Sequence, residues 1–180
     1  MKKKIVERYD LSDDGEVIIK ISAERVEDLY SQFDKKSSFS KKDLDSELVT
    51  YLIDSVDEIG KEPFFIKFYL EDEIEEKLQN KVKNSIRQYF FYLQDLKKKM
   101  MHEEIKNSFI FIVIGLFFTT MSLLTGEDER FFVEVLSEGM LVAGWVSLWE
   151  AMATLLIKWL PLTKKLKLYK RISSCEILFS

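Results

Sequence analysis

The sequence has only one cysteine and one histidine among its 180 residues, with six glycines and two prolines. A single cysteine excludes an intramolecular disulfide framework, and one cysteine with one histidine argues against a structural zinc site. So few glycines and prolines exclude collagen-like and low-complexity chains. A net charge of −4 gives the chain no overall attraction to nucleic acid. We therefore expect a folded protein without a metal, a cofactor or a nucleic-acid partner.

Charge is distributed unevenly along the chain. Residues 1–107 hold 20 Lys and Arg and 24 Asp and Glu, whereas residues 108–180 hold only seven of each. The run Ser108–Thr125 has no charged residue in 18 positions. As a helix it would be roughly 27 Å long, enough for the hydrocarbon core of a bilayer. A buried helix of a soluble protein is the alternative, but this chain is too short to build a large core around one.

A second apolar run follows after a short polar connection. From Gly139 to Ile157 it is interrupted only by Glu150, and Pro161 is expected to end it. The connection, residues 126–130, is so short that it predicts an antiparallel helical hairpin. We predict a transmembrane hairpin over residues 108–161, with spans at 108–125 and 133–160.

Basic residues flank both ends of this hairpin on one side, while the connection offers only Arg130. The positive-inside rule then predicts a multi-pass protein of the inner (plasma) membrane with both termini in the cytoplasm. The flanking cations are expected to face anionic lipid of the inner leaflet. They are Lys97, Lys98, Lys99, Lys164, Lys165, Lys167, Lys170 and Arg171.

Residues 1–70 predict a small cytoplasmic α/β domain. Alternating apolar residues indicate strands at 16–22 and 63–70, and helical spacing indicates a helix from Asp43 to Gly60 between them. A strand, helix, strand order suggests parallel pairing. Residues 5–11 are a candidate partner strand, turned at residues 12–15, and a short helix capped by Ser22 is expected next.

Residues 71–107 predict one long amphipathic helix that runs directly into the first span. Its apolar stripe either packs on the small sheet or pairs with the same helix of a second subunit. Residues 162–180 predict a basic amphipathic tail on the inner leaflet. The predicted fold class is an integral membrane α-helical hairpin with a small cytoplasmic α/β domain.

Each predicted span has one face of small or polar residues, which suits close helix packing. At 100° per residue that face carries Ser108, Gly115, Thr119 and Ser122 in the first span, and Gly139, Ala143, Ser147, Glu150 and Thr154 in the second. An ionised Glu150 against lipid costs a few kcal/mol or more. It is therefore protonated, bonded within a packed bundle, or exposed to water in a pore shared by several subunits.

These features lead to two hypotheses about function. A homo-oligomer could form a cation pore lined by the second span, with Glu150 as an inner ring and Glu127, Asp128 and Glu129 as an acidic outer mouth. The alternative is a non-conducting anchored scaffold or sensor whose cytoplasmic domain binds a protein partner. No nucleotide-binding or catalytic motif is present, and a His-dependent site would have to use His102 in a juxtamembrane helix. We expect no enzyme.

Two pairs of segments carry a family resemblance. They are DLYSQFDKK with DLDSELVTYLID, and GWVSLWEAMATLLIKWLP with LKLYKRI. Together they resemble an uncharacterised group of small prokaryotic two-span membrane proteins with a cytoplasmic N-terminal α/β domain. The resemblance implies the same topology and carries no activity with it.

Overall fold

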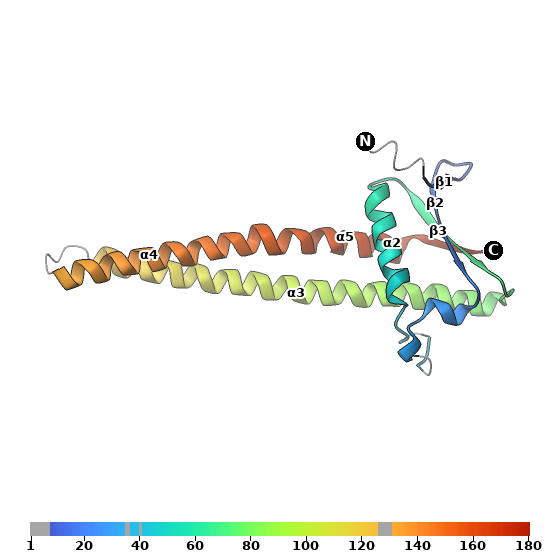
Figure 1. Cartoon of the computed structure of the whole chain (residues 1–180), viewed down its shortest axis with the longest axis horizontal. Coiled ribbons are helices and arrows are strands. Elements are labelled where there is room, and N and C mark those ends of the chain that lie inside the picture. Colours follow the sequence, from blue (N-terminus) through green and yellow to red (C-terminus); the bar gives the residue numbers. More distant parts are fainter. Residues whose placement is uncertain (1–7, 35–36, 40, 126–130) are drawn as a thin grey trace. The chain divides into compact units, whose positions relative to one another are not determined.

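The computed structural model describes residues 8–34, 37–39, 41–125 and 131–180. The chain is mostly helical and forms two compact units (Figure 1). Residues 1–95 and 166–180 make the α/β unit, and residues 96–165 make the hairpin unit. The outer acidic residues Glu127, Asp128 and Glu129 lie outside the described residues.

A four-stranded sheet organises the α/β unit. Its strands are β1 (Asp10–Leu11), β2 (Val17–Ala23), β3 (Phe64–Leu70) and β4 (Glu176–Phe179), in the order β1-β2-β3-β4. The pairing of β1 with β2 is antiparallel, while β2, β3 and β4 run parallel. The predicted strands at 16–22 and 63–70 and their parallel pairing are confirmed. The fourth strand was not predicted.

Helices connect these strands. They are α2 (Ser46–Ile59), α3 (Glu76–Thr125) and α5 (Leu160–Ser174), with short 3₁₀ turns at η1 (Val26–Leu29) and η2 (Gln32–Asp34). The predicted helix cap at Ser22 is wrong, because Ser22 lies inside β2 and the first helical turn begins at Val26. The long helix begins at Glu76, five residues later than predicted.

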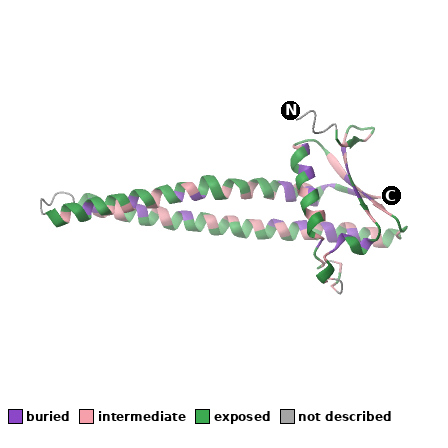
Figure 2. Cartoon of the chain, in the orientation of Figure 1, coloured by how far each residue is buried: buried purple, intermediate pink, exposed green. Residues whose placement is uncertain are grey.

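One face of the sheet and the three helices share a single hydrophobic core. The sheet contributes alternating residues of β2, β3 and β4, with Ile19 facing Ile66 and Ile66 facing Ile177 in the strand register. Val82, Ile86 and Phe90 of α3 are fully buried in this core. These three residues therefore pack on the sheet, which is one of the two roles predicted for the apolar stripe of the long helix. Figure 2 shows the buried residues of this unit in purple.

The last part of the chain belongs to this core. Leu168, Tyr169 and Ile172 of α5 are buried in it, and β4 completes the sheet. The amphipathic helix predicted after residue 162 exists, but its apolar face packs against protein rather than lying free on lipid. Arg171 also differs from its predicted role as a lipid-facing cation. Its guanidinium donates to the backbone carbonyls at the end of α2, Val56, Gly60 and Glu62.

Local signals explain where α2 begins and ends. The Asp45 carboxylate accepts hydrogen bonds from the backbone N–H of Glu47 (2.9 Å) and of Leu48 (3.2 Å), which caps the helix N-terminus. Gly60 has a φ of 69°, a conformation that disfavours other residues and ends the helix. Both ends match the sequence prediction within three residues.

Two antiparallel helical segments form the hairpin unit. One is α3 from residue 96 onward, and the other runs through α4 (Phe131–Ala153), the π-helical turn η3 (Thr154–Trp159) and the start of α5. Pro161 does not end the helix as predicted. It lies inside one continuous helix, Phe131–Ser174, directly after the π-helical turn, which interrupts the regular α-helical hydrogen bonding where the proline lacks a backbone N–H.

Both helical segments are long and apolar enough to cross a membrane. Only 17% of each apolar window is buried inside the chain. A core helix of a soluble protein would be mostly buried, so the apolar surface of these helices is not explained by packing within this one chain.

Candidate functional site

The two helices of the hairpin meet along a row of small residues, which we call the seam. These residues recur at every seventh position, and each is buried. Seven-residue spacing keeps one face of two helices in continuous contact, as in coiled coils. The seam consists of Ser108, Gly115 and Ser122 on α3, and of Ser137, Gly144 and Ala151 on α4.

Contacts across the seam are close at both ends. The Ser108 hydroxyl donates to the Ala151 carbonyl at 3.0 Å. The hydroxyls of Ser122 and Ser137 lie 3.2 Å apart, and the Ser137 hydroxyl also lies 2.9 Å from the Ser122 carbonyl. These polar groups therefore satisfy one another inside the hairpin.

At the centre of the seam the two backbones approach through glycine. A Cβ atom added to Gly144 would lie 3.0 Å from both the Gly115 carbonyl oxygen and the Thr119 backbone nitrogen. The Thr119 hydroxyl donates to the Gly115 carbonyl at 2.8 Å within α3. Only glycine fits this approach without a shift of the backbone.

The predicted small-residue stripe contains the seam residues of α3 but none of the seam residues of the second segment. Ser108, Gly115 and Ser122 are buried and Thr119 is half-buried. In the second segment Thr154 is buried, Ala143 and Ser147 are half-buried, and Gly139 and Glu150 are exposed. Ser137, Gly144 and Ala151, which make the contact, were not singled out. Their seven-residue spacing, matched by Ser108, Gly115 and Ser122, is the signal that would have found them.

Glu150 lies on the apolar outer surface of the hairpin. Its neighbours along the helix, Trp149 (71% exposed) and Val146 (63% exposed), are large apolar side chains. Among the described residues, the Glu150 carboxylate has no hydrogen-bond or ion-pair partner. The seam contacts are made without it, so its carboxylate remains available for water or for another copy of the chain.

The predicted lipid-facing lysines are exposed with the exception of Lys97. Lys97 is half-buried, with its ammonium 3.5 Å from the Met100 sulfur. The others are exposed: Lys98, Lys99, Lys164, Lys165, Lys167 and Lys170. They are compatible with a charged membrane surface or with solvent.

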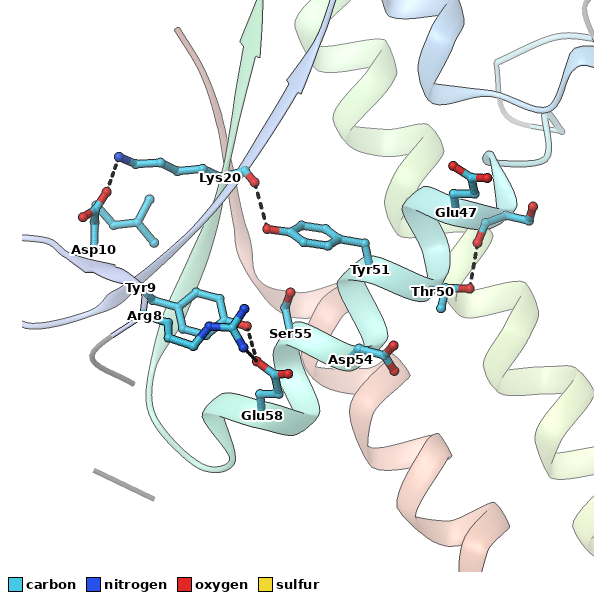
Figure 3. A pocket seen from close by; sticks show the side chains of 12 residues that line it. Arg8, Tyr9, Asp10, Lys20, Glu47, Thr50, Tyr51, Asp54, Ser55 and Glu58 are labelled. Atoms are coloured by element: carbon cyan, nitrogen blue, oxygen red, sulfur yellow. Dashed lines mark hydrogen bonds and ion pairs between the residues drawn. The ribbon is translucent and has the colours of Figure 1, made fainter. Parts of the chain in front are cut away.

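A separate cleft of about 650 Å³ opens in the α/β unit between the β1 and β2 strands and α2 (Figure 3). One face of α2 lines it with acidic and aromatic side chains spaced at helical intervals. These side chains are Glu47, Tyr51, Asp54 and Glu58.

Hydrogen bonds and ion pairs hold the walls of this cleft together. The Tyr9 hydroxyl donates to the Glu58 carboxylate at 2.9 Å, and the Tyr51 hydroxyl donates to the Lys20 carbonyl at 3.3 Å. Partial burial raises the pKa of the Tyr9 phenol, and the nearby Glu58 carboxylate raises it further, so the phenol stays protonated and able to donate.

Both basic side chains that line the cleft already have acidic partners. Arg8 lies 4.0 Å from Glu58, and Lys20 forms an ion pair with Asp10. Glu47 and Asp54 have no basic partner among the described residues, so no described cation neutralises these two carboxylates on either side of Tyr51 in the helix.

No cluster of three or more metal-ligating side chains occurs among the described residues. Cys175 is a buried free thiol whose Sγ donates to the Ile172 carbonyl at 3.1 Å. Burial raises the pKa of this thiol to about 12, which keeps it protonated and unreactive at neutral pH.

Comparison with protein-family models, with curated proteins and with solved structures finds no match for this chain. Its function is therefore argued from its own residues, and the resemblance to two-span prokaryotic membrane proteins stays a hypothesis.

Proposed function

We propose that the chain is an integral protein of the inner (plasma) membrane, inserted as a two-span hairpin with both termini in the cytoplasm. Two apolar helices that their own chain leaves largely uncovered support insertion, and the basic residues that flank them support this orientation. Hydrocarbon would cover the apolar surface of the hairpin helices that the chain itself leaves exposed.

We further propose that copies of the hairpin assemble and that the assembly is a cation pore lined by the second span. The observation that carries this proposal is the exposed carboxylate of Glu150, which lies among apolar side chains and has no partner in the part of the chain that the structure describes. A charge left against hydrocarbon is costly. A homo-oligomer removes that cost by turning the Glu150 side chains toward a shared aqueous path, where a ring of carboxylates attracts cations.

The test measures assembly and conduction together. Purified full-length protein should be oligomeric in detergent and should pass cation-selective current in planar bilayers. Replacing Glu150 with glutamine removes the charge of the ring, so cation-over-anion selectivity should fall by about tenfold if the ring supplies roughly 1.4 kcal/mol of discrimination. Glu138→Gln, an exposed carboxylate on the same helix, is the matched control and should leave selectivity unchanged. A monomer, or an assembled protein without current, contradicts the pore.

The cleft in the α/β unit favours a second candidate function, a non-conducting scaffold or sensor that binds a cytoplasmic partner. Its free carboxylates and Tyr51 ring suit a cationic side chain of that partner. In this case the hairpin serves as an anchor. Glu150→Leu should then leave function unchanged as long as the protein still forms its oligomer.

An arginine-containing peptide is a direct probe of the cleft. Asp54→Asn should weaken its binding to the full-length protein about fivefold, since an exposed ion pair contributes up to about 1 kcal/mol. Isothermal titration at low salt measures the affinity. Glu24→Gln, an exposed carboxylate outside the cleft, should not change it. Equal binding by the parent protein and Asp54→Asn would exclude the cleft as the site.

A further inference from the structure

The second helical segment of the hairpin changes its hydrogen-bonding pattern at one place. Residues Thr154–Trp159 form a π-helical turn between α4 and α5. Such turns are rare, carry one residue more per turn than an α-helix, and frequently occur at functional sites.

Buried polar atoms without hydrogen bonds gather beside this turn. In the described part of the chain, four buried side-chain polar atoms have no hydrogen-bond partner, and three of them belong to the hairpin unit. These three are Glu104 Oε2, Thr154 Oγ1 and Trp159 Nε1. The Thr154 side chain is only 1% exposed.

Two cross-helix contacts place Glu104 of α3 beside this turn. The Ser108 hydroxyl meets the Ala151 carbonyl at 3.0 Å, and one helical turn earlier on α3 the Glu104 carboxylate lies 3.9 Å from the Lys158 ammonium. Ala151 and Lys158 are the residues of the second segment that make these contacts. Thr154 comes between them along the helix and is buried, so its side chain is placed between the two contacts. Trp159 follows Thr154 by five residues, the span of one π-helical hydrogen bond, so both lie on the same side of the helix.

The three atoms differ in whether they donate or accept hydrogen bonds. The Glu104 carboxylate accepts hydrogen bonds, the Trp159 indole donates one, and the Thr154 hydroxyl does both. The Lys158 ammonium repels a metal cation here, and the Glu104 carboxylate repels an anion. A distance of 3.9 Å between these two charges is also too long for a direct hydrogen bond.

We propose that the π-helical turn holds a buried water molecule that bridges Glu104, Thr154 and Trp159. A buried water typically makes about three hydrogen bonds to polar groups that would otherwise be unsatisfied. The three orphaned atoms provide that number and the right mixture of donors and acceptors.

This site goes beyond the proposed pore and does not depend on it, because every group that binds the water belongs to one copy of the hairpin. The water gives the Glu104 carboxylate a partner with exchangeable protons inside an otherwise apolar contact. It makes this turn a local hydration site beside an ion pair.

Magnetisation transfer from water to the Trp159 indole N–H tests the proposal. The full-length protein is labelled with ¹⁵N-tryptophan, reconstituted in lipid bilayers and studied by solid-state NMR, with the resonance assigned through Trp159→Phe. Rapid transfer to Trp159 is expected. Thr154→Val keeps the side-chain shape but removes a ligand of the water, so the rapid transfer should be lost.

Ser147→Ala is the matched control, because the Ser147 hydroxyl already donates to the Ala143 carbonyl at 2.9 Å within its own helix. It should leave the transfer to Trp159 intact. Absence of rapid transfer in the parent protein would overturn the proposal, since the site would then be dry. Rapid transfer that survives in Thr154→Val would also overturn it, since the indole would then be reached by bulk solvent.

Discussion

Replacing Gly144 with alanine should destabilise the hairpin by about 1–3 kcal/mol, the usual cost of overpacking a close contact. The added Cβ would lie 3.0 Å from the Gly115 carbonyl oxygen and from the Thr119 backbone nitrogen. Backbone atoms cannot rotate away, so the helices must separate, and the bonds between Ser122 and Ser137 should weaken as well. All three tryptophans lie in the hairpin unit, so their fluorescence during an SDS titration in mixed micelles measures its unfolding.

Gly139→Ala is the matched control for this prediction. Gly139 is exposed on the same helix, and a Cβ added there meets no atom within 4 Å. Because alanine favours an exposed helix interior by about 1 kcal/mol over glycine, this variant should be neutral or slightly more stable. A Gly144→Ala protein as stable as Gly139→Ala would mean that the helices do not touch through the seam.

The sequence pattern did not distinguish the packed Gly144 from the exposed Gly139. A 3.6-residue period counted from Gly139 placed Glu150 on the small-residue face. On that scale the predicted face spans about 0° to 80°, whereas Gly144 falls at about 140°, so the residues that pack lie on a neighbouring face of the helix. In the first span, which has no charged residue, the predicted face is the one that packs against the second helical segment. In the second, the predicted face carries the exposed Gly139 and Glu150, whereas Gly144 makes the contact.

In the α/β unit, local signals were sufficient for β2, α2 and β3. Alternation, an Asp cap and a terminal glycine are each read within a few residues. Strand β4 has no such signal, because four residues after a basic helix are too few to show a period. Its partner β3 is also distant in the sequence. The same basic, amphipathic pattern fits a helix on a membrane and a helix that packs on a sheet, and only the tertiary contacts of Leu168, Tyr169 and Ile172 distinguish them.

The second large effect on stability is expected from a substitution in β4, the C-terminal strand. Ile177 of β4 is 1% exposed, pairs in register with Ile66 and belongs to the core. Ile177→Ala should therefore lower the stability of the α/β unit by about 2–5 kcal/mol through lost burial and a residual cavity. Hydrogen exchange at the β2 and β3 amides measures this loss separately from the hairpin, and those amides should exchange faster.

Glu176→Ala, one residue earlier in the same strand, separates a packing effect from a general effect of altering the tail. Glu176 is exposed, so its replacement should change stability by no more than about 0.5 kcal/mol. If residues 162–180 were instead a surface tail on lipid, neither substitution would alter exchange in β3. Slow exchange of β3 in Ile177→Ala would restore that interpretation, whereas fast exchange in this variant alone would establish the last strand as part of the folded domain.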